Sequence, residues 1–119
     1  EFSLVEGKPV YDHLLELTKP KELDFEMDLY WITRGGGDPL SYFEKWPGRF
    51  PLVHVKDAGP APEFAMEDVG KGTIRWAEIF AHRKEAGIKH YFVEHDNPAD
   101  PLASIRASYA YLKALEFRG

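Results

Sequence analysis

Hydrophobic and polar residues alternate in three short runs of the chain, and each run is followed by turn residues and then by a helical pattern. The runs are LDFEMDLYWI (23–32), FPLVHVKD (50–57) and IKHYFVEHD (88–96). Alternating strands and helices are typical of a parallel sheet covered by helices. The sequence therefore predicts an α/β fold, with a first helix at 9–17 followed by three strand–helix units.

Two of the expected helices have well-marked starts. Asp38-Pro39 and Asp100-Pro101 each place an N-cap residue directly before a proline suited to the first helical turn. After the second pair the apolar residues follow helical spacing, which predicts one buried stripe. The members of this stripe are Leu102, Ile105, Tyr109 and Leu112.

A further helix is expected at 74–86. It would be capped by Thr73 and would end at Gly87, a residue type common after helix C-termini. The preceding GKG sequence (70–72) lacks the spacing of a phosphate-binding or dinucleotide-binding motif. We interpret it as part of the turn into the helix.

The faces of the predicted strands separate apolar from chemically active residues, because successive side chains point to opposite sides. Asp28, His54 and Glu94 lie late in their runs and on the face opposite the apolar one. Parallel α/β sheets place their functional groups at these strand ends. In the first run, the expected apolar face holds Phe25, Met27, Leu29 and Trp31, and the opposite face holds Glu26, Asp28 and Tyr30.

An aspartate, a histidine and a glutamate that converge from adjacent strands form a donor set suited to Mn²⁺, Mg²⁺, Co²⁺ or Zn²⁺. Taken singly, each residue has an ordinary structural interpretation. Asp28 could be a cap, His54 a hydrogen-bonded core residue, and Glu94 half of an ion pair with Lys56. Both interpretations remain open from the pattern alone.

Composition narrows the classes of partner. The chain has 119 residues, of which 44% are hydrophobic and 29% charged, as expected for one globular domain. Its formal charge of -5, without a basic stripe, argues against a nucleic-acid partner and favours a small ligand. No window approaches the roughly 18 apolar residues of a membrane span, and no secretory signal is evident, so we expect a cytoplasmic protein.

The motifs FEMDLYW, HVKD, VGKGTIRW and YFVEHDN, in this order and spacing, resemble the last three strand–helix units of the sugar phosphate isomerase/epimerase family, whose fold is a xylose isomerase-like TIM barrel. The resemblance covers about 9–115. It implies Asp28, His54 and Glu94 as ligands of a divalent metal, with a further ligand from a strand that precedes residue 1.

The resemblance also implies an activity, which is proton transfer next to a carbonyl through a metal-bound enediolate. Glu94 would then act as ligand and as catalytic acid/base, while Lys56, Trp31 and Tyr30 would line the site of a sugar or sugar phosphate. Two alternatives stay open. One is a lyase or hydrolase of the same barrel superfamily, and the other is a non-catalytic half-barrel that self-associates.

A TIM barrel needs roughly 250 residues and eight strands, whereas only three strands are evident here. We therefore expect residues 1–119 to be the C-terminal part of such a barrel. It would be completed either by a missing N-terminal half-barrel or by a second copy in a homodimer. As an enzyme, the isolated chain would be incomplete.

Overall fold

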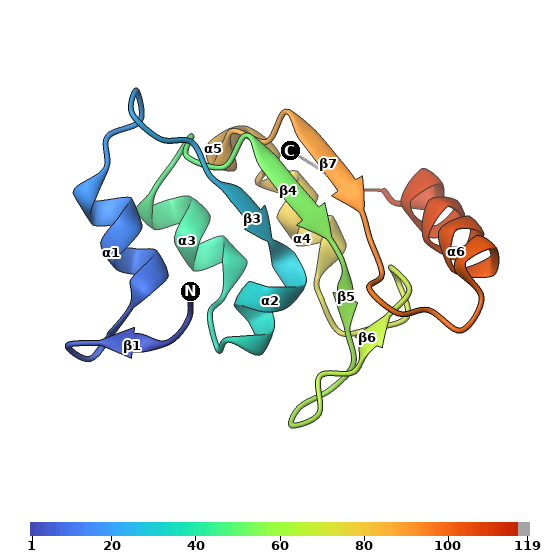
Figure 1. Ribbon diagram of the computed structural model, residues 1–119. Coiled ribbons are helices and arrows are strands. Elements are labelled where there is room, and N and C mark those ends of the chain that lie inside the picture. The colour runs from blue at the N-terminus through green and yellow to red at the C-terminus, as the bar shows by residue number, and fades with distance from the viewer. Residues whose placement is uncertain (117–119) are drawn as a thin grey trace.

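A three-stranded parallel sheet forms the centre of the protein. The computed structural model describes residues 1–116, and the sheet has the strand order β3–β4–β7, with β4 in the middle (Figure 1). In chain order the elements are β1 (Leu4–Val5), β2 (Lys8–Pro9), α1 (Val10–Leu17), β3 (Glu26–Asp28), α2 (Leu29–Arg34), α3 (Pro39–Lys45), β4 (Leu52–Val55), β5 (Asp57–Ala58), β6 (Met66–Glu67), α4 (Trp76–Ala81), α5 (Arg83–Ala86), β7 (His90–Val93) and α6 (Pro101–Ala114).

One face of the sheet is packed against helices. Met27 of β3 and Val53 and Val55 of β4 are almost completely buried. They join a core that includes Phe43 of α3 and Trp76 of α4. Burying a side chain of this size contributes about 1.5 to 3 kcal/mol, so this face fixes which residues of each strand point to the other side.

The first predicted strand is shorter than expected. It ends at Asp28, and Leu29 already begins helix α2, so the expectation that Leu29, Tyr30 and Trp31 continue the strand was wrong. The physical reason is the Asp28 side chain, which accepts hydrogen bonds from the backbone N–H groups of Tyr30 and Trp31 and so caps a helix at this point.

The helix expected at 74–86 is also different in detail. It is divided into α4 and α5 at His82, and it begins at Trp76 rather than after a Thr73 cap. The Thr73 hydroxyl instead donates to the carbonyl of Ala58, which ties the preceding loop to the sheet. Gly87 ends α5 in the left-handed conformation (φ 84°), as predicted.

The buried carboxylate of Asp57 holds the loop that leads into α4. Asp57 is 0% exposed. It accepts hydrogen bonds from five donors, which are the backbone N–H groups of Ala58, Gly70, Gly72 and Ile74 and the indole N–H of Trp76. Leaving one buried donor unpaired costs about 1 to 3 kcal/mol. Asp57 therefore makes the GKG segment a fixed part of the fold, and a Cβ at Gly72 would lie 2.3 Å from its carboxylate.

Of the stripe predicted on helix α6, only Leu112 packs against the core, where it is partly buried. Leu102, Ile105 and Tyr109 are 60% to 65% exposed, and the buried residues of the helix are Ser104 and Ser108. The Ser104 hydroxyl donates to Asp68, and the Ser108 hydroxyl accepts from the N–H of Val69. These bonds turn the polar side of α6 toward the 68–69 loop.

The exposed stripe faces an open edge of the sheet. Strand β7 is an edge strand, and α6 lies beside it (Figure 1). An apolar groove of about 370 Å³ is lined by Tyr91 and Val93 of β7 together with Ile105 and Tyr109 of α6.

Although α6 is the longest of the described helices, none of them is long and apolar enough to cross a bilayer.

We expect the isolated chain to associate through this groove. For the unmodified chain, the average mass measured by light scattering should rise with protein concentration. Ile105→Glu should reduce this rise, because a charge in the stripe opposes burial of an apolar surface. Ala110→Glu, on another side of the same exposed helix, is the matched control and should leave association unchanged. A monomeric mass at all concentrations for the unmodified chain would contradict this expectation.

Candidate metal centre

The parallel register brings the three predicted ligands to one end of the sheet. Asp28 is the last residue of β3 and pairs with His54 of β4, which in turn pairs with Phe92 of β7. Glu94 follows β7 directly, and its N–H donates to the carbonyl of Val55. Since Glu94 is two residues beyond Phe92, its side chain returns to the face that carries His54.

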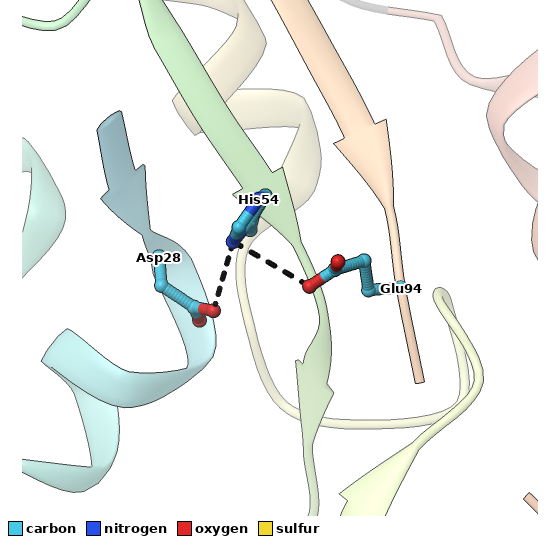
Figure 2. Close-up of side chains that lie close together, drawn as sticks. All are labelled: Asp28, His54 and Glu94. Carbon is cyan, nitrogen blue, oxygen red and sulfur yellow. Dashed lines mark ion pairs between the residues drawn. The ribbon is translucent and has the colours of Figure 1, made fainter. Parts of the chain in front are cut away.

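The side chains of Asp28, His54 and Glu94 converge (Figure 2). The Nδ1 atom of His54 lies 3.4 Å from Asp28 Oδ2 and 3.4 Å from Glu94 Oε2. One ligand atom from each residue lies within 4.8 Å of the others. Two carboxylate oxygens and one imidazole nitrogen at these separations fit a divalent ion such as Mn²⁺, Mg²⁺, Co²⁺ or Zn²⁺.

The two carboxylate oxygens of Asp28 have different partners. Its Oδ1 atom accepts the N–H groups of Tyr30 and Trp31, each at 3.0 Å, and thereby caps α2. Its Oδ2 atom faces His54 and Lys56. The cap fixes the orientation of the carboxylate, so that one oxygen remains directed at the cluster, as an outer hydrogen bond does for a metal ligand.

A third carboxylate approaches the histidine from the other side. Glu26 Oε1 lies 3.2 Å from Nε2 of His54. A carboxylate at this distance favours a proton on Nε2, which directs the Nδ1 lone pair at the oxygens of Asp28 and Glu94. Three electron-rich atoms then face one another, and a cation between them relieves the repulsion.

Lys56 lies among the same carboxylates. Its side chain is only 7% exposed, and its Nζ atom lies 3.1 Å from Asp28 Oδ2, 2.8 Å from Glu94 Oε2 and 2.9 Å from Asp96 Oδ1. Burial by itself would lower the pKa of the ammonium. The hydrogen bonds to Glu94, Asp96 and Asp28 outweigh burial and raise the pKa above its ordinary value, so the group stays charged.

The other two residues expected to line a sugar site lie on α2. Tyr30 is buried, and its hydroxyl donates to the carbonyl of Phe64 and accepts from Arg34. It therefore holds the 57–66 loop and does not present a free hydroxyl to the cluster. Trp31 is 40% exposed, and its ring contacts the ring of Tyr30 and the guanidinium of Arg34.

Sequence reasoning missed two carboxylates of the site. Glu26 had been placed on the correct face, two residues before Asp28, but no role followed from that position. Asp96 lies two residues beyond Glu94, in a loop that follows β7. The spacing of two residues was the available signal in both cases, because it returns a side chain to the same face of an extended chain.

The fold was compared with known proteins. No family model matches the sequence, and no curated protein matches it significantly. Among solved structures, a sugar phosphate isomerase/epimerase from Parabacteroides distasonis ATCC 8503 matches with a TM-score of 0.79 and 30% identity, over 96% of this chain and 38% of its own. A second structure described in the same words from that organism gives 0.78 and 32%, over 100% of this chain and 40% of its own.

The chain resembles the sugar phosphate isomerase/epimerase proteins. A xylose isomerase domain protein from Planctomyces limnophilus also shares the fold, with a TM-score of 0.69 at 24% identity over 86% of this chain and 42% of its own. The resemblance expected from the motifs, including the xylose isomerase-like fold type, is therefore confirmed. The chain spans only about two fifths of the length of these structures.

The two roles of Asp28 can be separated by mutation. Asp28→Asn keeps an oxygen that accepts the N–H groups of α2, whereas Asp28→Ala removes the cap. Both variants lose the charge that faces Lys56. We expect Asp28→Ala to be less stable than Asp28→Asn by about 1 kcal/mol, measured by urea unfolding. Equal stabilities would show that the cap contributes nothing to the fold.

Proposed function

We propose that Asp28, His54 and Glu94 hold a divalent metal in a sugar or sugar phosphate isomerase/epimerase. The observation that carries the proposal is the convergence of these three side chains within 4.8 Å at the strand ends. It is supported by the likeness to two structures described as sugar phosphate isomerase/epimerase. The ligand atoms would be Asp28 Oδ2, His54 Nδ1 and Glu94 Oε2.

The bound ion would supply Lewis-acid polarisation of a substrate carbonyl, which makes the adjacent C–H more acidic. In this proposal Glu94 transfers the proton at that carbon. Its side chain is 43% exposed, whereas those of Asp28 and His54 are 16% and 29% exposed, so it is the most accessible of the three to a substrate. A carboxylate that takes a proton from one carbon and returns it to the neighbouring carbon gives isomerisation through an enediolate, when the hydroxyl proton also moves between the two oxygens.

Lys56 and Trp31 are the proposed substrate contacts. The Lys56 ammonium is charged and directed at the cluster, where it can donate to a hydroxyl or anionic group of a sugar. The exposed part of the Trp31 ring offers an apolar surface next to the Asp28 cap. Tyr30 would act indirectly, because its hydroxyl is used by Phe64 and Arg34.

We also propose that the chain is the C-terminal half of a (β/α) barrel. The open edge at β7 and the exposed stripe of α6 support this, since both are suited to packing against a further strand. The fraction of the matched structures that is covered, 38% and 40%, is close to the share of three of eight strands. Two copies would supply six such strands, so we favour further barrel strands of a longer polypeptide.

Metal binding tests the ligand set. We expect Mn²⁺, titrated into the chain by calorimetry, to bind at least about tenfold more weakly to His54→Ala, because one of the three donors is lost. His82→Ala is the matched control, since His82 is exposed, pairs with Glu85 and is not one of the three proposed ligands. An affinity that is the same in His54→Ala as in the unmodified chain would rule out this ligand assignment.

The reaction class is tested by proton exchange. In D₂O with Mn²⁺ and a ketose phosphate, we expect the longer polypeptide that completes the barrel to introduce deuterium at the carbon next to the carbonyl, detected by proton NMR. Glu94→Gln, which removes the base and keeps the shape, should slow the exchange at least about 100-fold. Exchange at an undiminished rate in Glu94→Gln would show that another group transfers the proton.

A further inference from the structure

The ammonium group of Lys56 uses the same oxygen atoms as the proposed metal site. It lies 3.1 Å from Asp28 Oδ2 and 2.8 Å from Glu94 Oε2. These two atoms also face His54 Nδ1, each at 3.4 Å. A protein-borne cation therefore contacts both carboxylate ligands of the triad.

A divalent ion and this ammonium compete for the same two oxygens. An ion such as Mg²⁺ binds oxygen at about 2.1 Å. An ion within bonding distance of Asp28 Oδ2 and Glu94 Oε2 would lie against an ammonium that is already hydrogen-bonded to both. Like charges at such a separation repel strongly where the side chains are shielded from water. Binding of the ion requires the ammonium to move away from at least one of these atoms.

Asp96 already contacts the ammonium and can remain its partner when the other two carboxylates are released. Its Oδ1 atom lies 2.9 Å from Lys56 Nζ, and it is not one of the three triad ligands. The backbone N–H of Asp96 contacts the sulfur of Met66, which places this loop against the β5–β6 hairpin. Lys56 can therefore keep one charged partner while it releases Asp28 and Glu94.

We propose that Lys56 is a built-in competitor for the metal, which neutralises the carboxylate ligands in the metal-free protein. When a divalent ion binds, its ammonium withdraws from Asp28 and Glu94 and keeps its ion pair with Asp96. The inference rests on the proposed metal site. A monovalent ion brings no more charge than the ammonium it would displace, whereas a divalent ion brings twice as much. Competition by Lys56 thus favours divalent over monovalent cations.

The test compares Mn²⁺ affinities at fixed pH and low salt, measured by calorimetry. Lys56→Met removes the ammonium and keeps an unbranched side chain, and we expect it to bind Mn²⁺ at least tenfold more tightly than the unmodified chain. Lys71→Met makes the same charge change at an exposed residue that pairs with Asp68. It should stay within twofold of the unmodified chain, because its charge is remote from the triad.

The role of Asp96 is tested by a double-mutant cycle. Asp96→Asn leaves Lys56 with the triad carboxylates as its only charged partners among the described residues, so it should weaken Mn²⁺ binding at least threefold. In the Lys56→Met background the same change should alter the affinity less than twofold. An equal loss in both backgrounds would show that Asp96 does not act through Lys56 and would overturn its role as the retained partner.

The failures of the two proposals are distinguishable. If the unmodified chain binds Mn²⁺ in a His54-dependent manner and Lys56→Met binds it equally or more weakly, the metal site stands and the competitor role is wrong. If replacing His54 changes the Mn²⁺ affinity neither in the unmodified chain nor in Lys56→Met, the metal site itself is wrong, and so is the inference that rests on it.

A second measurement needs no variant at the site and so does not depend on the folding of Lys56→Met. In the ¹⁵N-lysine-labelled chain, the ammonium signal of Lys56 should shift during a Mg²⁺ titration, while that of Lys71 should not. A Lys56 signal that does not change at saturating Mg²⁺ would overturn the proposal.

Discussion

The parallel pairing of β4 with both β3 and β7 is the constraint on which the candidate site depends. It aligns Asp28 with His54 and brings Glu94 alongside through its bond to Val55. A shift of one residue in either pairing would turn the affected ligand toward the helices. Burial of Met27, Val53 and Val55 opposes such a shift, because it would move these apolar side chains to the open face. The apolar core therefore fixes the geometry of a polar cluster to which it contributes no atoms.

The same pairing concentrates negative charge. Glu26, Asp28, Glu94 and Asp96 surround His54 and Lys56. Three of these four carboxylates contact the ammonium of Lys56, which is the one permanently charged cation of the cluster among the described residues. In a partly buried region, an excess of one charge destabilises the fold unless an ion or a proton compensates it. This balance explains why the caps and ion pairs around the cluster do not argue against a metal site. Asp28 is a cap and Glu94 is paired with Lys56, as the structural interpretations of these residues had it, and both still direct an oxygen at His54.

The sequence predicted the positions of Asp28, His54 and Glu94 because they follow from the two-residue period of strands and from the rule that parallel strands end at one edge. It did not predict where β3 ends. Asp28 fits the alternating pattern of a strand and also the preference for an N-cap. The local pattern does not show whether the residues after Asp28 continue the strand or begin a helix. Tyr30 and Trp31 consequently lie on α2. The prediction that helix α6 buries its apolar stripe was wrong for another reason. Its periodicity was read correctly, but burial of an apolar stripe needs a second layer, and among the described residues no strand lies beyond β7 to provide it.

The three strands position the proposed ligands but do not enclose a substrate. Three neighbouring strands suffice to position two carboxylates and an imidazole around one point, because each ligand is set by contacts within its own strand or with the next one. Enclosure of a substrate has different requirements, since it needs walls on every side of that point. The open edge at β7 leaves one side of the cluster without such a wall, and the groove beside α6 has the apolar lining that a neighbouring strand would cover. Metal affinity is therefore a property that we expect of these residues themselves, whereas we expect efficient turnover only when further strands pack against the two open edges, β3 and β7.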